Sequence, residues 1–148
     1  MENKVTFRNA ERKDTGLILQ FVKELAAYED MSDDVIADES ILETWIFDKQ
    51  KAEVIFAVVD GTEVGFALFF HNFSTFLGRA GLYLEDLFVM PEYRGKGYGK
   101  ALLKNWHPLQ WNVVADVLNG SVSIGTSQVS IFIFLLVPNH RQTGPFTA

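Results

Sequence analysis

Residues 84 to 103 read LEDLFVMPEYRGKGYGKALL, and this stretch decides the fold of the chain. The apolar run Leu87–Met90 predicts a strand, which Pro91 ends because proline has no N–H to donate to a sheet. Arg94–Gly99 forms a glycine-rich turn that carries two cations. Ala101–Leu103 are good helix formers on an apolar stripe. A strand, a glycine-rich turn and a helix therefore follow one another.

This turn has the chemistry of an anion cradle. Glycines let backbone N–H groups approach an anion closely, and the start of the following helix adds a favourable dipole. Arg94 and Lys96 add positive charge, so the turn predicts a pyrophosphate site. It lacks both the GxGxxG spacing of dinucleotide-binding strands and the GK[ST] ending of a nucleotide P-loop. The alternative is an ordinary strand–turn–helix with convenient glycines.

Arg94, Gly97 and Gly99 fill the pattern Q/R-x-x-G-x-G/A, which resembles the acetyl-CoA signature of the GNAT superfamily of N-acetyltransferases. The flanks YLEDLFVM (83–90) and KELAAYE (23–29) resemble its diamine and polyamine branch, the spermidine/spermine acetyltransferases. The resemblance covers about residues 1–105. It implies an α/β (α+β) fold with a mixed, mostly antiparallel sheet flanked by helices, acetyl-CoA as cosubstrate, and a homodimer.

Composition limits the other classes of function. A chain of 148 residues with 48% hydrophobic and 22% charged residues is typical of one globular domain. It has no cysteine, so disulfides, thiolate chemistry and a metal site are not expected. It lacks an apolar signal core and any apolar run near the roughly 20 residues that span a bilayer, so we expect a cytoplasmic protein without a membrane partner. The net charge of −6 disfavours nucleic acid and favours a small cationic substrate.

Hydrophobic periodicity and turn residues predict the order β-α-α-β-β-β-α. Asp14 is the expected N-cap of the first helix, and Asp60-Gly61 is the expected two-residue turn of a hairpin. The predicted elements are a strand at Val5–Arg8, a helix to Tyr28, a helix from Asp38 or Glu39 to Phe47, strands at Val54–Val59, Glu63–Phe70 and Gly81–Met90, and a helix from Lys96 to about Asn105.

Between Glu29 and Glu43 the chain has seven acidic residues and no basic one. One interpretation is a solvated loop and helix face. The other is an electrostatic funnel that concentrates a polyamine or diamine. The family resemblance places Tyr28 and Glu29 where the substrate pocket begins.

Acetyl transfer requires backbone N–H donors that polarise the thioester carbonyl, here expected at Leu87–Val89, and a route for the amine proton. Strand alternation predicts that Glu85 and Asp86 lie on opposite faces, so that one of them can hold the ammonium group and relay its proton. The alternative is a carboxylate paired with a surface lysine. His71 and Tyr83 are weaker candidates.

The candidate site residues follow. The catalytic candidates are Glu85 and Asp86; the substrate-binding candidates are Tyr28, Glu29 and Asp86; the cofactor-binding candidates are Leu87, Phe88, Val89, Arg94, Gly95, Lys96, Gly97, Tyr98, Gly99 and Lys100.

The family pattern stops near Asn105. Residues 1–105 hold 30 of the charged residues, whereas residues 106–148 hold only Asp116 and Arg141. The expected Asn-x-Pro-Ser-x-x-Phe-Tyr segment with its general-acid tyrosine is missing, and no tyrosine follows Tyr98. We therefore divide the single domain into an acetyl-CoA-binding core, 1–105, and an atypical low-charge tail, 106–148.

The genetic code suggests an origin for this tail. Read one base out of frame, the codons of Trp111-Asn112 force a glutamate, those of Ile124–Ile133 permit Trp-Asn-Lys-Pro-Ser-Ile-Asp-Phe-Tyr, and those of Leu136–Asn139 permit Leu-Gly-Ala-Glu. Our hypothesis is an out-of-frame ending. Its uncharged run Val129–Val137 predicts a strand that adds to the edge of the fourth strand or pairs with another chain.

Three functions remain open at this point. The first is an N-acetyltransferase that moves an acetyl group from acetyl-CoA to a primary amine of a small cationic substrate: a polyamine, a diamine or a lysine-like amine. The second is a CoA-binding chain with impaired catalysis, because the general-acid segment is missing. The third is a non-enzymatic product with an incomplete sheet.

Overall fold

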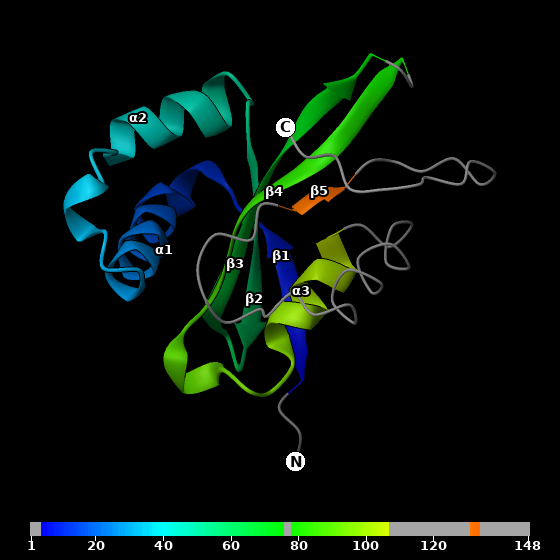
Figure 1. Cartoon of the computed structure of the whole chain (residues 1–148). Helices are drawn as coiled ribbons and strands as arrows, with labels where there is room; N and C mark the ends of the chain where they lie inside the picture. Colours follow the sequence, from blue (N-terminus) through cyan, green and yellow to red (C-terminus); the bar gives the residue numbers. More distant parts are fainter. Residues whose placement is uncertain (1–3, 76–77, 107–130, 134–148) are drawn as a thin grey trace.

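An antiparallel sheet in the order β1-β2-β3-β4-β5 organises the chain. The computed structural model describes residues 4–75, 78–106 and 131–133. Helices α1 and α2 lie on one side of the sheet and α3 lies on the other (Figure 1). The predicted α+β class and element order are thus confirmed. The strands are β1 (Val5–Asn9), β2 (Glu53–Val59), β3 (Thr62–Ser74), β4 (Arg79–Val89) and β5 (Ile131–Ile133). The helices are α1 (Thr15–Tyr28), α2 (Glu39–Glu43) and α3 (Tyr98–Trp106), with short turns η1 (Arg12–Asp14), η2 (Ser32–Asp34), η3 (Thr44–Asp48) and η4 (Pro91–Tyr93).

The β2–β3 hairpin forms at the predicted turn. Asp60 and Gly61 both have positive φ, 50° and 77°, which an Asp-Gly pair adopts readily. Strands β3 and β4 extend beyond the predicted bounds, to Ser74 and from Arg79. The Phe70 and Tyr83 rings lie 4.8 Å apart on this extension, so aromatic cross-strand packing contributes to it.

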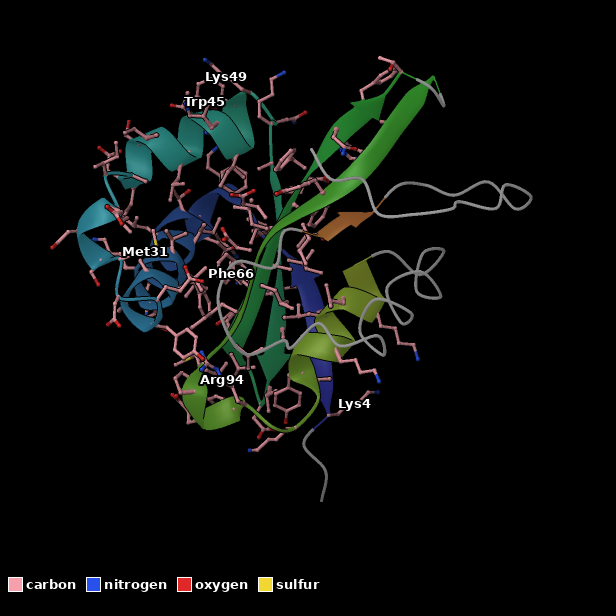
Figure 2. All side chains as sticks on the ribbon, viewed as in Figure 1. Lys4, Met31, Trp45, Lys49, Phe66 and Arg94 are labelled. Atoms are coloured by element: carbon pink, nitrogen blue, oxygen red, sulfur yellow. The ribbon has the colours of Figure 1, made fainter. Side chains whose placement is uncertain are left out.

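Two hydrophobic clusters pack on the two faces of the sheet. Burial on both faces explains why residues 54–59 of β2 and 64–70 of β3 are apolar without alternation. The α3-side cluster contains Ile55, Ala57, Val59, Val64, Ala67, Phe69, Leu84, Tyr98, Leu102 and Leu103. The α1-side cluster contains Ile18, Phe21, Ile46, Val54, Phe56, Phe66 and Phe88. Phe66 lies at the centre of the molecule, and its ring stacks on Phe21 at 5.4 Å (Figure 2).

Strand β4 carries a bulge at Glu85. Leu68 pairs with Asp86 while the next residue, Phe69, pairs with Leu84, so one residue of β4 has no counterpart on β3. As a result Leu84 and Leu87 both pack against the α3-side cluster. Strict alternation is broken here, so strand parity no longer determines the faces of Glu85 and Asp86, and their opposite facing stays a prediction.

Asp14 directly precedes α1, as predicted, but its side chain does not cap the helix. Both of its carboxylate oxygens accept hydrogen bonds from Arg8 at 2.8 Å, and Arg8 also donates to Glu63 at 2.8 Å. The hydrogen bonds from Arg8 hold the pKa of Asp14 and that of Glu63 below their ordinary values. Asp14 therefore ties β1 to the start of α1 instead of closing the helix end.

Helix α2 begins as predicted, because the Asp38 carboxylate accepts from the Ile41 N–H at 2.8 Å. It then widens into the π-helical turn η3, which runs to Asp48, one residue past the predicted end at Phe47. Arg12 bonds both ends of this turn, with its guanidinium 2.8 Å from Glu43 and 2.8 Å from Asp48. The wide turn is thus held in place from η1.

The tail contributes β5, which pairs antiparallel with β4 through Leu82–Leu84. This confirms the predicted strand, and its place at the edge of β4, for Ile131–Ile133. The other predictions for residues 107–148 lie outside the described residues. None of the helices that the structure describes combines the length and the apolar character needed to cross a membrane.

Candidate active site

The outer edge of β4 presents backbone polar groups beyond its pairing with β5. The Met90 N–H donates to the Val64 carbonyl of β3 at 2.8 Å. Since hydrogen-bonded pairs alternate along an antiparallel ladder, the N–H groups of Leu87 and Val89 point away from β3. The Val89 carbonyl faces the same way, because it accepts from Arg94 Nε at 2.7 Å. Of the predicted donors Leu87–Val89, Leu87 and Val89 therefore have N–H groups that point outward from this edge of β4.

The loop that follows has the conformation of an anion cradle. Gly95 and Gly97 have φ of 77° and 81°, a left-handed conformation that other residues rarely adopt. Space is not the reason for glycine, since a Cβ at either position would meet nothing within 4 Å. Helix α3 starts at Tyr98, two residues later than predicted, and its first bond runs from the Ala101 N–H to the Gly97 carbonyl. The first N–H groups of a helix have no acceptor within it, so they can bind an anion.

The two cations of the loop have different surroundings. Lys96 is exposed, with its ammonium 5.6 Å from the centre of the Tyr93 ring. Arg94 instead lies on the α1 side of the sheet (Figure 2). Its guanidinium carbon is 4.2 Å from the Tyr28 ring centre and 5.2 Å from that of Phe88. Sequence spacing alone does not distinguish the two.

Three carboxylates gather where α1 ends beside the bulge of β4. Burial, then the charges of Glu85 and Glu29, raise the pKa of Asp86 to about 6. Glu29 directly follows α1, and Glu85 is exposed. The structure thus brings the predicted residues Tyr28, Glu29, Glu85 and Asp86 into one region. A carboxyl group with such a pKa can exchange protons near neutral pH, and the negative charge around it favours a cation.

The rest of the acidic run is divided in its roles. Asp38 caps α2 and Glu43 pairs with Arg12, so these two carboxylates are structural. Asp33 and Asp34 are exposed on η2, as the solvated interpretation expects. Among the acids of the run, Glu29 is the one whose charge acts on Asp86.

The weaker candidates His71 and Tyr83 lie on the long β3–β4 extension. His71 is exposed and pairs with Leu82, while Tyr83 is half-buried against Phe70. Both are on the far side of the bulge from Leu87. The contact with Phe70 favours a packing role for Tyr83.

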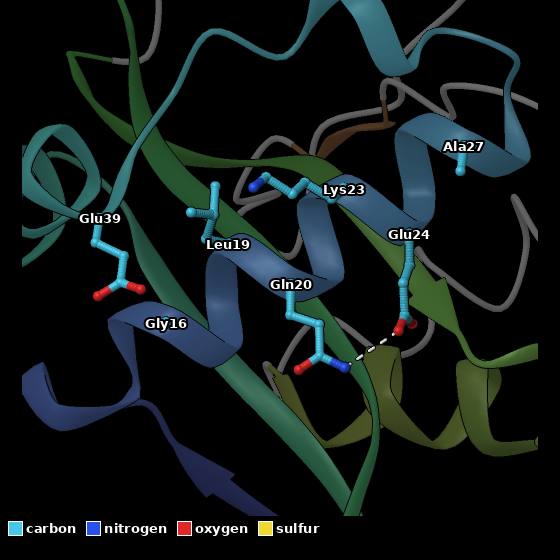
Figure 3. Close-up of a pocket in the computed structure, with 7 residues that line it drawn as sticks. All are labelled: Gly16, Leu19, Gln20, Lys23, Glu24, Ala27 and Glu39. Atoms are coloured by element: carbon cyan, nitrogen blue, oxygen red, sulfur yellow. Dashed lines mark hydrogen bonds between the residues drawn. The ribbon is translucent and has the colours of Figure 1, made fainter.

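An open pocket of about 400 Å³ lies elsewhere, on the outer face of α1 (Figure 3). Gln20 donates to Glu24 across its rim at 3.2 Å, and Glu39 of α2 closes one end near Gly16. Its lining contains none of the predicted site residues.

Sequence reasoning missed two features of the site. The bulge at Glu85 depends on the register with β3, which no local pattern encodes. The stacking of Arg94 on Tyr28 depends on how α1 packs over β4. The apolar helical position of Tyr28 is the one signal that could have suggested that its ring faces the sheet.

Comparisons with known proteins agree on one family. Residues 19–105 match the family model described as the acetyltransferase (GNAT) family. The bovine (Bos taurus) thialysine N-epsilon-acetyltransferase is 38% identical over an alignment of 109 residues, and the match covers 68% of this chain and 64% of that protein. The human (Homo sapiens) spermidine/spermine N(1)-acetyltransferase-like protein 1 is 33% identical over 105 residues, 66% of this chain and 15% of that protein. The chain thus spans less than two thirds of either relative.

A likeness in solved structures supports the fold. A predicted acetyltransferase from Clostridium acetobutylicum, solved with acetyl-CoA, superposes with a TM-score of 0.58 at 16% identity. The match covers 79% of this chain and 76% of that one.

Proposed function

The chain belongs to the acetyltransferase (GNAT) family, and we propose that it transfers an acetyl group from acetyl-CoA to a primary amine of a small cationic substrate. The observation that carries this proposal is the juxtaposition at β4. An edge with outward N–H groups leads into a glycine cradle, and Asp86, with a pKa raised to about 6, lies on the same strand. The names of the relatives, which act on thialysine or resemble spermidine/spermine enzymes, favour a polyamine, diamine or lysine-like amine.

The described residues fit acetyl-CoA. The outward N–H groups of Leu87 and Val89 can bind acyl and amide oxygens, and the Gly95–Lys100 segment can bind the pyrophosphate. Lys96 and Lys100 add positive charge there. Tyr98 packs in the α3-side cluster and Gly99 lies against Val89, while Phe88 packs on the opposite face of the sheet. When bound, acetyl-CoA would supply an activated acetyl thioester.

We assign the amine to the carboxylate cluster. Glu29 and Glu85 attract the ammonium group, and Tyr28, the last residue of α1, directly precedes Glu29 at this site. Asp86 is mostly ionised at neutral pH, so it can take the proton that the ammonium must lose before attack. A partly buried carboxylate with this pKa can return that proton to water between turnovers.

A second candidate is CoA binding with impaired turnover. The observation in its favour is that no tyrosine follows Tyr98, so the tail lacks the expected general acid. Loss of one acid–base group slows catalysis by roughly 10² to 10⁴. We propose that residues 1–105 are the binding core and that 106–148 are an out-of-frame ending of the same domain. The homodimer and the cytoplasmic location stay predictions.

A pair of glycine variants tests the site. Gly97→Ala should weaken CoA binding about tenfold, because a left-handed non-glycine residue costs about 1–2 kcal/mol. Gly61→Ala is the matched control, since Gly61 also has a left-handed φ, 77°, and open space around a Cβ, but lies in the β2–β3 turn. Calorimetric titration with CoA reads out both variants.

The same titration separates the functions when it is combined with an acetylation assay on spermidine and lysine. Saturable binding with acetylated product supports the enzyme, and binding without product supports the impaired chain. Absence of CoA binding to the unaltered protein contradicts both.

A further inference from the structure

Arg94 was expected to contribute charge to the cofactor phosphates, yet its guanidinium lies against two aromatic rings on the α1 side of the sheet. We propose that Arg94 is a positioning residue that fixes the Tyr28 ring, beside the proposed amine site at the end of α1, to the cofactor edge of β4. This inference rests on the proposed function and assigns one residue within it.

Three contacts hold the Arg94 side chain. Nε donates to the Val89 carbonyl at 2.7 Å, on the edge that we assign to the cofactor. The guanidinium carbon lies 4.2 Å from the Tyr28 ring centre and 5.2 Å from the Phe88 ring centre. Both distances are within the range of cation–π attraction. One side chain therefore joins the loop after β4, the strand itself and the end of α1.

The Arg94–Tyr28 contact is linked to the proposed amine site by the peptide chain. Tyr28 is the last residue of α1, and Glu29 follows it at once. The charge of Glu29 helps to raise the pKa of Asp86, so the two carboxyl groups are close in space. Because Phe88 is 4% exposed and belongs to the α1-side cluster, it is a fixed base for the guanidinium. Tyr28 is 45% exposed, so the contact with Arg94 restricts the conformations that its ring can adopt.

The chemistry of arginine suits this role. Its planar guanidinium can stack on a ring while Nε donates in the plane, which a lysine ammonium cannot reproduce. Lys96 offers the contrast. It is exposed beside the left-handed glycines, two residues along the same loop, where an incoming phosphate would approach. We therefore assign the phosphate charge to Lys96 and the positioning role to Arg94.

The test compares Arg94→Lys, Tyr28→Leu and the double variant, with Lys96→Gln as the matched control. The full chain is used, and each Kd is measured by calorimetry: first CoA, then spermidine on the CoA-saturated protein. No turnover is needed. Arg94→Lys keeps the charge, so a role in charge alone would survive it.

We expect Arg94→Lys to leave the Kd for CoA within about threefold and to raise the Kd for spermidine about five- to tenfold, through loss of the stacked contact. Tyr28→Leu should do the same. The double variant should lose no more than the larger single loss, because the two residues act through one contact. Lys96→Gln should show the reverse, with CoA binding weakened about fivefold and spermidine binding nearly unchanged.

Two outcomes overturn the inference while leaving the proposed function intact. One is a loss of CoA affinity of about tenfold or more in Arg94→Lys with spermidine binding unchanged. The other is independent, multiplying losses for Arg94 and Tyr28 in the double variant. A wild-type chain that binds no CoA contradicts the proposed function instead. Thermal unfolding of each variant, followed by circular dichroism, confirms that the compared proteins are folded.

Discussion

Neutralising Asp86 should stabilise the protein at neutral pH. The pKa of Asp86 is raised from 3.8 to about 6, so the native state holds its proton more tightly than the unfolded chain does. Below pH 3.8 the group is protonated in both states and contributes nothing. As the pH rises from 3.8 toward 6, Asp86 ionises in the unfolded chain first, so the free energy of unfolding falls. Above pH 6 Asp86 is ionised in both states, and this loss of stability stays constant.

The magnitude follows from the shift. A difference of about 2 units, at about 1.4 kcal/mol per unit, gives an upper limit of about 3 kcal/mol. Residual solvent around the partly exposed carboxylate lowers this value. The free energy of unfolding of Asp86→Asn, minus that of the wild type, should therefore rise between pH 4 and 6 and then stay level.

Urea unfolding at half-unit pH steps from 3.5 to 8 measures this difference. Asp60→Asn, an exposed residue in the β2–β3 turn, is the control for a simple loss of charge and should change the stability by less than about 0.5 kcal/mol. Glu29→Gln should narrow the pH range over which this stability difference rises, since Glu29 is one of the charges that raise the pKa of Asp86. A difference for Asp86→Asn that does not change from pH 4 to 8 would refute the reasoning.

Two further predictions concern stability. Arg8→Ala should lower the free energy of unfolding by about 2 kcal/mol at pH 7, because it leaves the largely buried Asp14 without its partner. Since Arg8 holds the pKa of Asp14 and of Glu63 low, their contribution is present above the ordinary carboxyl pKa and is lost in acid, so the deficit should shrink in urea unfolding at pH 3. Gly65→Ala should lower the stability by about 2 kcal/mol in thermal unfolding, because its Cβ would lie 2.6 Å from the Phe88 carbonyl oxygen. An unchanged melting temperature would show that β4 moves aside.

Features set by neighbouring residues could be predicted from the sequence. The Asp60-Gly61 turn, the cap at Asp38 and the glycine turn between β4 and α3 each depend on chemistry within a few residues, and the structure contains all three. The strand in the tail followed from the uncharged run around Ile131–Ile133. Local propensity and backbone sterics suffice for such elements.

Features set by contacts far along the chain could not be predicted. The side chain of Asp14 was expected to cap α1, but Arg8 attracts it, together with Glu63, which is 55 residues from Arg8. The bulge at Glu85 arises from the pairing of β4 with β3, and the position of Arg94 arises from the packing of α1. Each of these depends on the register between elements, which the sequence pattern leaves open.

The two clusters described above share one sheet, with Ile55 and its neighbour Phe56 belonging to opposite faces. Effects of mutations that share no contact add, whereas effects within one packed group couple. Mutational effects in one cluster should therefore be nearly independent of those in the other. With the sites as we propose them, substitutions on the α1 face are predicted to change amine binding, and those on the α3 face to change CoA binding. The two properties could then be altered by separate sets of core substitutions.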